Sequence, residues 1–163
     1  MPEGGRKASS IGYVYNAPPF YHQTLLCVMR LPERRTFLVA QRTVDEAALV
    51  LKHAKSANSI YVSRAVDAQL RRMHLREAYG CAQTLSSHVD ETWALFPPTA
   101  TTERKPYISE AMYRDWVGLV DKELSLLKGV VKADGKHYSK YLKEDTAFRP
   151  IDAGVQMRFF DPA

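Results

Sequence analysis

Residues 65–96, AVDAQLRRMHLREAYGCAQTLSSHVDETWALF, decide the fold class, because their apolar residues recur at the three- and four-residue spacing of a helix. Pro97-Pro98 ends the pattern, since proline lacks a backbone N–H and cannot continue the helical hydrogen bonds. On a helical wheel the apolar stripe that begins at Val66 lies about 130° from the stripe that follows Gly80. We therefore expect this helix to kink, break or change its packing partner within residues 79–87.

A second amphipathic helix is predicted C-terminal to this one. Ser109 is a suitable N-cap residue and Gly129 a natural C-terminal stop. The apolar residues between them, including Trp116, recur at helical spacing, so we expect this face in the core. Asp134-Gly135 then predicts a tight turn, either within a hairpin or between two helices.

The first 65 residues favour short strands. Thr24–Leu31 and Thr36–Gln41 are rich in β-branched and apolar residues and are joined by four residues, which suits a hairpin, although the first run also fits a short helix. Thr43 and Glu46 have the spacing of a capping box, which predicts that a helix begins there. Residues 59–63 (SIYVS) form a further strand candidate.

These elements predict a helix-dominated α+β domain with three or four helices and a few short strands in the first 65 residues; an all-α bundle is the alternative. A chain of 163 residues corresponds to one domain. We expect an aromatic-rich N-terminal arm over residues 1–22, a single globular domain over residues 23–145 and an extended C-terminal tail over residues 146–163.

The predicted arm carries large aromatic rings, which are favoured anchors at protein interfaces. Its prolines at positions 18 and 19 favour an extended segment over a helix. The candidate partner-binding residues are Tyr13, Tyr15, Phe20 and Tyr21 in the arm and Phe159 and Phe160 in the tail. The alternative is that the arm packs back on its own domain and closes its core.

The net charge of +5 is unevenly distributed along the chain. Residues 30–76 hold ten basic and four acidic residues, and arginine suits bidentate contacts to phosphate. The candidate nucleic-acid contacts are Arg34, Arg35, Arg64, Arg71, Arg72 and Arg76, with Tyr61 as a ring for stacking. The alternatives are an acidic protein partner, attracted by the same charge, and a basic face in contact only with water.

No motif for catalysis, phosphate binding or metal binding occurs in the sequence. His74, Cys81 and His88 are spaced by seven residues, which is about 10.5 Å along a helix and too far for one metal ion. Cys27 and Cys81 stand in apolar stretches, where cysteine is usually a small buried side chain. We therefore expect no enzymatic activity, no cofactor and no metal site.

No apolar run approaches the roughly 20 residues that span a bilayer, so no membrane span is expected. Two cysteines and the absence of a signal-peptide pattern favour an intracellular, reducing compartment, and the cytoplasm over an organelle. The predicted function is that of a non-enzymatic structural or interaction subunit of a larger protein assembly, anchored by its aromatic terminal arms. The alternative is a basic RNA-associated protein, such as a ribonucleoprotein subunit, that uses the arginine-rich stretch 30–76.

Overall fold

The structure, a computed structural model, describes residues 11–97 and 106–143, apart from the side chains of residues 33–38 and 143. The described residues form five helices and no strand: α1 (Gly12–Val28), α2 (Glu33–Ser59), α3 (Ala65–Leu95), α4 (Glu110–His137) and α5 (Ser139–Lys143). The predicted α+β class with short strands is therefore wrong. The alternative, an all-α bundle, is what the described residues form.

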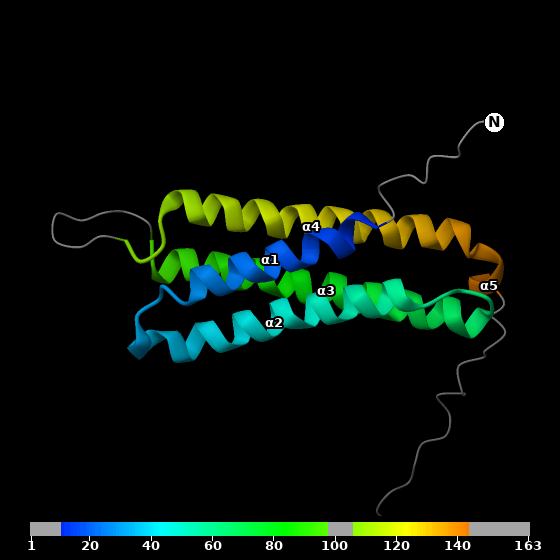
Figure 1. The fold of residues 1–163 in the computed structure, drawn as a ribbon, viewed down its shortest axis with the longest axis horizontal. Helices are drawn as coiled ribbons and strands as arrows, with labels where there is room; N and C mark the ends of the chain where they lie inside the picture. The colour runs from blue at the N-terminus through cyan, green and yellow to red at the C-terminus, as the bar shows by residue number, and fades with distance from the viewer. Residues whose placement is uncertain (1–10, 98–105, 144–163) are drawn as a thin grey trace, which may run out of the picture.

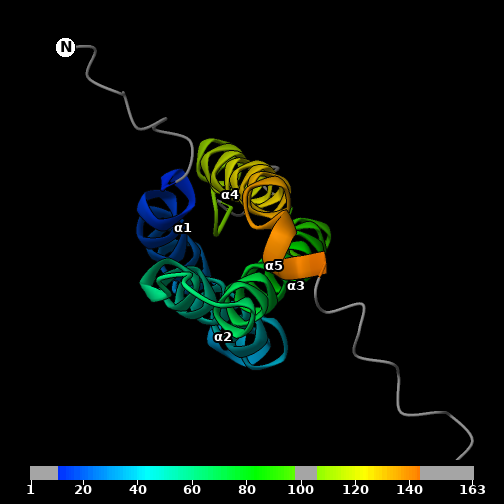
Figure 2. The same cartoon turned by 90° about the vertical axis from the view of Figure 1, so that its right-hand side faces the viewer.

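Helices α1 to α4 run alternately in opposite directions along one axis (Figure 1). Viewed end-on, each helix packs between two neighbours, α1 opposite α3 and α2 opposite α4 (Figure 2). This is the up-down-up-down arrangement of a four-helix bundle. The short helix α5 crosses the end of the bundle where α3 begins and α4 ends.

Helix α1 is the shortest of the four long helices and covers only part of α4. Trp116 of α4 donates its indole N–H to Thr24, and Gly12 lies so close to Leu126 that a Cβ there would be 3.0 Å from its Cδ2. The last turns of α4, the start of α3 and the end of α2 therefore extend beyond the first residue of α1 (Figure 1).

The prediction that residues 1–22 form an arm without regular structure is wrong for residues 12–22, which belong to α1. The expected boundary between residues 22 and 23 consequently falls inside a helix. Tyr13 and Phe20 are fully buried. Pro18 and Pro19 lie on the exposed side of α1. The carbonyl groups that receive no N–H from these prolines can therefore accept hydrogen bonds from water. The stabilisation gained by burying one apolar face of α1 thus exceeds the cost of placing two prolines inside the helix. Residues 1–10 and the predicted tail over 146–163 lie outside the described residues.

The predicted strands and the predicted start of α2 are also wrong. The run 24–31 ends α1, the run 36–41 lies within α2, and residues 60–64 connect α2 to α3. Thr43 lies inside α2, where its buried hydroxyl donates to the carbonyl of Val39 at 2.7 Å. A threonine hydroxyl can bond one turn back as well as cap a helix, so the spacing to Glu46 did not mark a helix start.

Helix α3 is continuous, and the predicted break within residues 79–87 does not occur. Its buried side chains share one side of the helix: Ala68, Leu75, Ala78, Ala82, Leu85 and Val89. Val66, Leu70 and Met73 are instead 44–56% exposed. The displaced apolar stripe is therefore an exposed strip on the outer face of the first half of α3, not a sign of a kink.

Helix α4 begins as predicted and ends later than predicted. The Ser109 hydroxyl accepts a hydrogen bond from the backbone N–H of Met112, which confirms the N-cap, and Trp116 is fully buried, which confirms its core position. The helix continues past Gly129 and through Asp134-Gly135 to His137. Its last turns are held by Val130 in the core and by an ion pair of Asp134, and these contacts outweigh the turn preference of the dipeptide.

Candidate nucleic-acid interface

Contacts of Arg71 bring the ends of three helices together. Its Nε donates to Asp134 Oδ2 of α4 at 2.6 Å, and its Nη1 donates to the carbonyl of Ala57 of α2 at 2.7 Å. The side chain is only 12% exposed, and the carboxylate and carbonyl that it meets satisfy part of its hydrogen-bonding capacity. The start of α3 thus lies beside the end of α4 and the end of α2.

We call this half of the bundle, residues 50–79 and 126–142, the basic end. It holds ten basic residues, Lys52, Lys55, Arg64, Arg71, Arg72, Arg76, Lys128, Lys132, Lys136 and Lys140, and three acidic ones, Asp67, Glu77 and Asp134. The remaining described side chains include four basic and eight acidic residues: Arg30, Arg42, Arg114, Lys122, Asp45, Glu46, Asp90, Glu91, Glu110, Asp115, Asp121 and Glu123. The two halves of the described bundle therefore carry net charges of opposite sign, which orients a charged partner towards one end.

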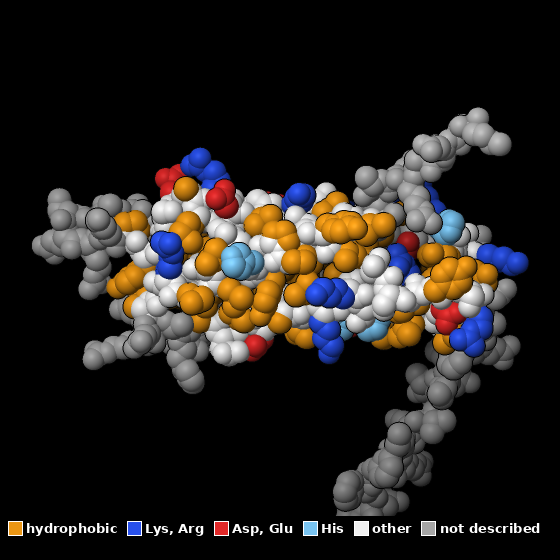
Figure 3. Space-filling model, viewed as in Figure 1, with side chains coloured by type: hydrophobic (Ala, Val, Ile, Leu, Met, Phe, Trp, Pro, Cys, Tyr) orange, Lys and Arg blue, Asp and Glu red, His pale blue; other side chains and the backbone are white. Residues whose placement is uncertain are grey.

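The surface view agrees with this division. Lys and Arg side chains gather where α4, α5 and the connection between α2 and α3 meet, at the right of Figure 3. Hydrophobic side chains dominate the middle of the same face, over α1 and its neighbours. Lys and Arg side chains also lie on the left half of this face, some of them beside Asp and Glu side chains, so it is the net positive charge that is greater at the basic end.

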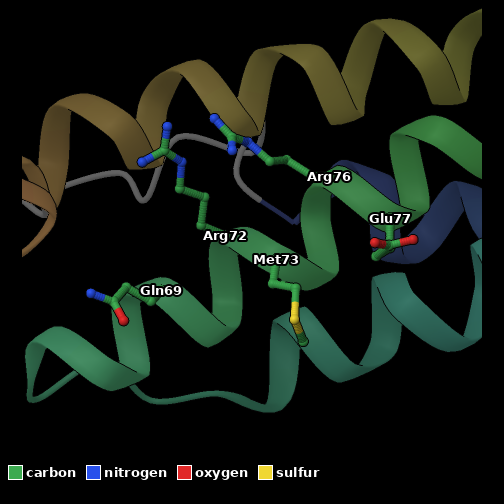
Figure 4. Close-up of a pocket in the computed structure, with 5 residues that line it drawn as sticks. All are labelled: Gln69, Arg72, Met73, Arg76 and Glu77. Carbon is green, nitrogen blue, oxygen red and sulfur yellow. The ribbon is translucent and has the colours of Figure 1, made fainter. Parts of the chain in front are cut away.

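Some of these basic side chains line a groove between α3 and α4. Arg72 and Arg76 extend from α3 towards α4, whereas Met73 points to the α2 side (Figure 4). Arg76 and Lys128 line a hollow of about 370 Å³ together with Tyr79, Gly80, Gln83 and Val131. An adjoining hollow of about 350 Å³ is lined by Gln69, Arg72, Met73, Arg76 and Glu77. Cations from two helices above a partly apolar floor suit the sugar-phosphate backbone of a single strand.

An exposed aromatic ring lies at the same end of the molecule. Tyr61, in the connection between α2 and α3, is 87% exposed. An aromatic ring in this position has a free face on which a base can stack.

The six arginines predicted to contact nucleic acid do not form one surface. Arg72 and Arg76 are exposed at the groove, and Arg64 is exposed and pairs with Asp67 at 3.3 Å. Arg71 is mostly buried and links α3 to α4, so it is not a surface contact. Arg34 and Arg35 belong to the first turn of α2, at the opposite end of the bundle, and their side chains lie outside those that the structure describes.

Sequence reasoning missed the lysines that complete the basic end. Lys128, Lys132 and Lys136 recur every four residues along α4, and Lys140 follows in α5. The sum over residues 77–163 concealed them, because acidic residues on both sides of these lysines in the sequence give that stretch an acidic balance. The four-residue spacing was the available signal, since it predicts a basic stripe on one side of a helix.

The aromatic residues predicted to bind a partner are divided by the structure. Tyr13 and Phe20 are fully buried in the core of their own bundle, as in the alternative interpretation, and Tyr21 packs partly against it. Tyr15 is 75% exposed. Phe159 and Phe160 lie outside the described residues, so the structure shows nothing of them.

Three of the five histidines contact another histidine or a glutamate side chain. The Nδ1 atoms of His53 and His74 are 3.0 Å apart across α2 and α3, and burial together with His74 lowers the pKa of His53. His88 contacts Glu91 at 3.4 Å. Within residues 11–97 and 106–143, no group of three or more His, Cys, Asp or Glu residues is arranged to hold a metal ion.

Both cysteines are free thiols in environments that disfavour the thiolate. Burial raises the pKa of Cys27 to about 11. Burial and the neighbouring Glu46 raise the pKa of Cys81 to about 11 as well. A thiol acts as a nucleophile only when it is ionised, and a pKa of about 11 keeps both groups protonated at neutral pH.

Comparison with known proteins does not identify a function: no protein-family model matches the chain, and neither does any curated protein or solved structure. Of the helices that the structure describes, none has an apolar stretch long enough to cross a membrane.

Proposed function

We propose that this protein binds single-stranded nucleic acid through its basic end. The observation that carries the proposal is the segregation of charge: ten basic and three acidic residues at one end of the bundle, against an acidic excess in the rest of its described side chains. The net charge of the whole chain, +5, understates this local excess. Neutralising phosphates with such a surface releases counterions, which supplies most of the affinity of non-specific nucleic-acid binding.

The shape of the basic end favours a single strand over an acidic protein surface. Arg76 and Lys128 come from two helices and line one groove, and Arg72 lines the adjoining hollow on α3, so these cations can contact neighbouring phosphates. Tyr61 offers an exposed ring, and base stacking on aromatic side chains is the usual source of sequence-tolerant binding to single strands. An acidic protein would use the cations but would have no need of the ring.

A second proposal, the non-enzymatic subunit of a larger assembly, is supported by a different observation. Val66, Leu70 and Met73 form the exposed apolar strip on α3. Exposed apolar residues at helical spacing are typical of faces that pack against another protein. The aromatic arm gives this proposal less support than expected, because Tyr13 and Phe20 lie in the core of their own bundle.

Charge reversal at the groove tests the first proposal. Replacing Arg72 and Arg76 together by glutamate should weaken binding of a fluorescein-labelled 20-nucleotide RNA at least tenfold, because two phosphate contacts become repulsive. Fluorescence anisotropy between about 50 and 200 mM salt measures the association constant. The negative slope of its logarithm against the logarithm of the salt concentration should become less steep by about 1.4, since each phosphate contact contributes about 0.7.

The matched control reverses the same number of charges at the other end. Arg42→Glu with Arg114→Glu changes the net charge equally at two exposed positions, and we expect binding to change less than about twofold. If both double variants lost the same RNA affinity, binding would depend on the net charge of the protein, and the basic end would not be a specific binding site. A wild-type protein that binds no RNA at about 50 mM salt would overturn the proposal.

A further inference from the structure

We infer that a cavity at the basic end holds one nucleobase of the bound strand. This inference rests on the proposed function and names the part of the ligand that the site would recognise. The cavity has a volume of about 500 Å³ and lies at the start of α1, beside the ends of α2 and α4. This volume is within the range of small-molecule sites, and the polar residues that line it are Asn58, Arg71, Asp134, His137 and Tyr138.

Three of the residues that line the cavity present hydrogen-bonding groups whose charges balance. Arg71 and Asp134 form a close ion pair, so their charges balance. Asn58 adds an amide, which both donates and accepts. Adjacent donors and acceptors of this kind match the edge of a nucleobase.

Two aromatic rings also line the cavity. The rings of His137 and Tyr138 meet edge to face, with centroids 4.7 Å apart and planes at 82°. One ring can therefore stack on an inserted base while the other contacts its edge. Lys136 and Lys140 flank this pair in the sequence and supply charge for the phosphates on either side.

A base fits this cavity better than a phosphate does. Asp134 already neutralises the guanidinium of Arg71, and an anion placed between them would meet the carboxylate as well. Moving the unbalanced charge of a phosphate out of water is costly. A neutral planar base can form hydrogen bonds with the groups that line the cavity and adds no charge. The phosphates are therefore assigned to the lysines outside the cavity.

The test compares two fluorescein-labelled strands of about 12 nucleotides, one of abasic deoxyribose phosphates and one with a single adenine at its centre. Wild-type protein should bind the strand with adenine about tenfold more tightly, because only that strand fills the cavity. His137→Ala with Tyr138→Ala should remove this advantage and change affinity for the abasic strand less than about twofold. Asn58→Leu, at an exposed position, should reduce the advantage without altering the aromatic pair.

The control is Tyr61→Ala, which removes the exposed ring in the connection between α2 and α3 and should leave the adenine advantage intact, because the single adenine occupies the cavity. If the wild type binds both strands equally, the base site is overturned while the proposed function stands. If it binds neither strand nor the RNA above, the proposed function fails and the base site fails with it. An advantage that persists in both the aromatic double variant and Asn58→Leu would place the base elsewhere and overturn the inference.

Discussion

Replacing Trp116 by alanine should lower the free energy of unfolding by about 4 kcal/mol. The indole is fully buried between α1 and α4, and its N–H donates to the Thr24 hydroxyl at 2.9 Å. It also stacks near Tyr113, with ring centroids 6.2 Å apart. The substitution leaves a cavity in the bundle and removes a contact that holds α1 in place. Urea unfolding followed by circular dichroism measures the loss.

The other tryptophan of the chain is the matched control. Trp93 is 44% exposed and contacts the edge of Tyr113, with ring centroids 4.9 Å apart. Because less of its surface leaves water on folding, Trp93→Ala should cost about 1–2 kcal/mol. A loss below about 1 kcal/mol for Trp116→Ala would contradict the core position that the structure assigns to it.

The stability of the protein should fall as the pH rises from about 5 to 8, because of the buried Glu123. Its Oε2 accepts a hydrogen bond from Asn16 Nδ2 at 2.8 Å, whereas its Oε1 has no partner among the described residues. Burial raises the pKa of this carboxyl group to about 7, although Asn16 and Lys122 lower it in part.

The sign follows from the direction of the shift. The pKa in the folded protein lies above the ordinary glutamate value of 4.5, so the folded state binds the proton more tightly. Between the two pKa values the unfolded chain has lost this proton, whereas the folded protein keeps it. Folding must then take up a proton from solution, so the free energy of unfolding falls as the pH rises. The stabilisation is therefore complete below about pH 4 and is lost as the pH rises through about 7, for a total of about 3 kcal/mol.

Glu123→Gln keeps the shape of the side chain and removes its ionisation. We expect this variant to be more stable than the wild type by about 3 kcal/mol at pH 8 and nearly equal to it at pH 4. His53, whose pKa is lowered, destabilises the protein at low pH, so it acts in the opposite direction and cancels when the two proteins are compared.

Asp121→Asn, at an exposed position of the same helix, is the control, and its stability should follow the wild-type curve. Urea unfolding at several pH values between 4 and 8 gives the three curves. Parallel curves for the wild type and Glu123→Gln would contradict the buried, protonated state of this carboxyl group.

Parts of the fold were predictable because local chemistry decides them. The end of α3 follows from the prolines after Phe96, which cannot continue a helix, and the start of α4 follows from the hydroxyl of Ser109. The burial of Trp116 follows from the helical spacing of its apolar neighbours. Each of these signals involves residues within about one or two helical turns of each other.

Other local signals were wrong because long-range packing opposed them. Pro18 and Pro19 lie inside α1, where the buried faces around Tyr13 and Phe20 outweigh the lost hydrogen bonds. Asp134-Gly135 is helical because Asp134 pairs with a residue 63 positions away in the chain. Such contacts leave no pattern in a short stretch of sequence.

The candidate site shows the same division between sequence and structure. Local sequence patterns were sufficient to predict that Arg72 and Arg76 lie in a helix, that Trp116 is in the core, and that the chain carries an excess of positive charge. Which of these charges act together depends on how the helices pack. Antiparallel packing separates Arg42 from Arg76 and brings Lys128 to the same groove as Arg76. The physical reason is that electrostatic interaction depends on distance in space, and each long helix carries the two halves of its sequence to opposite ends of the bundle.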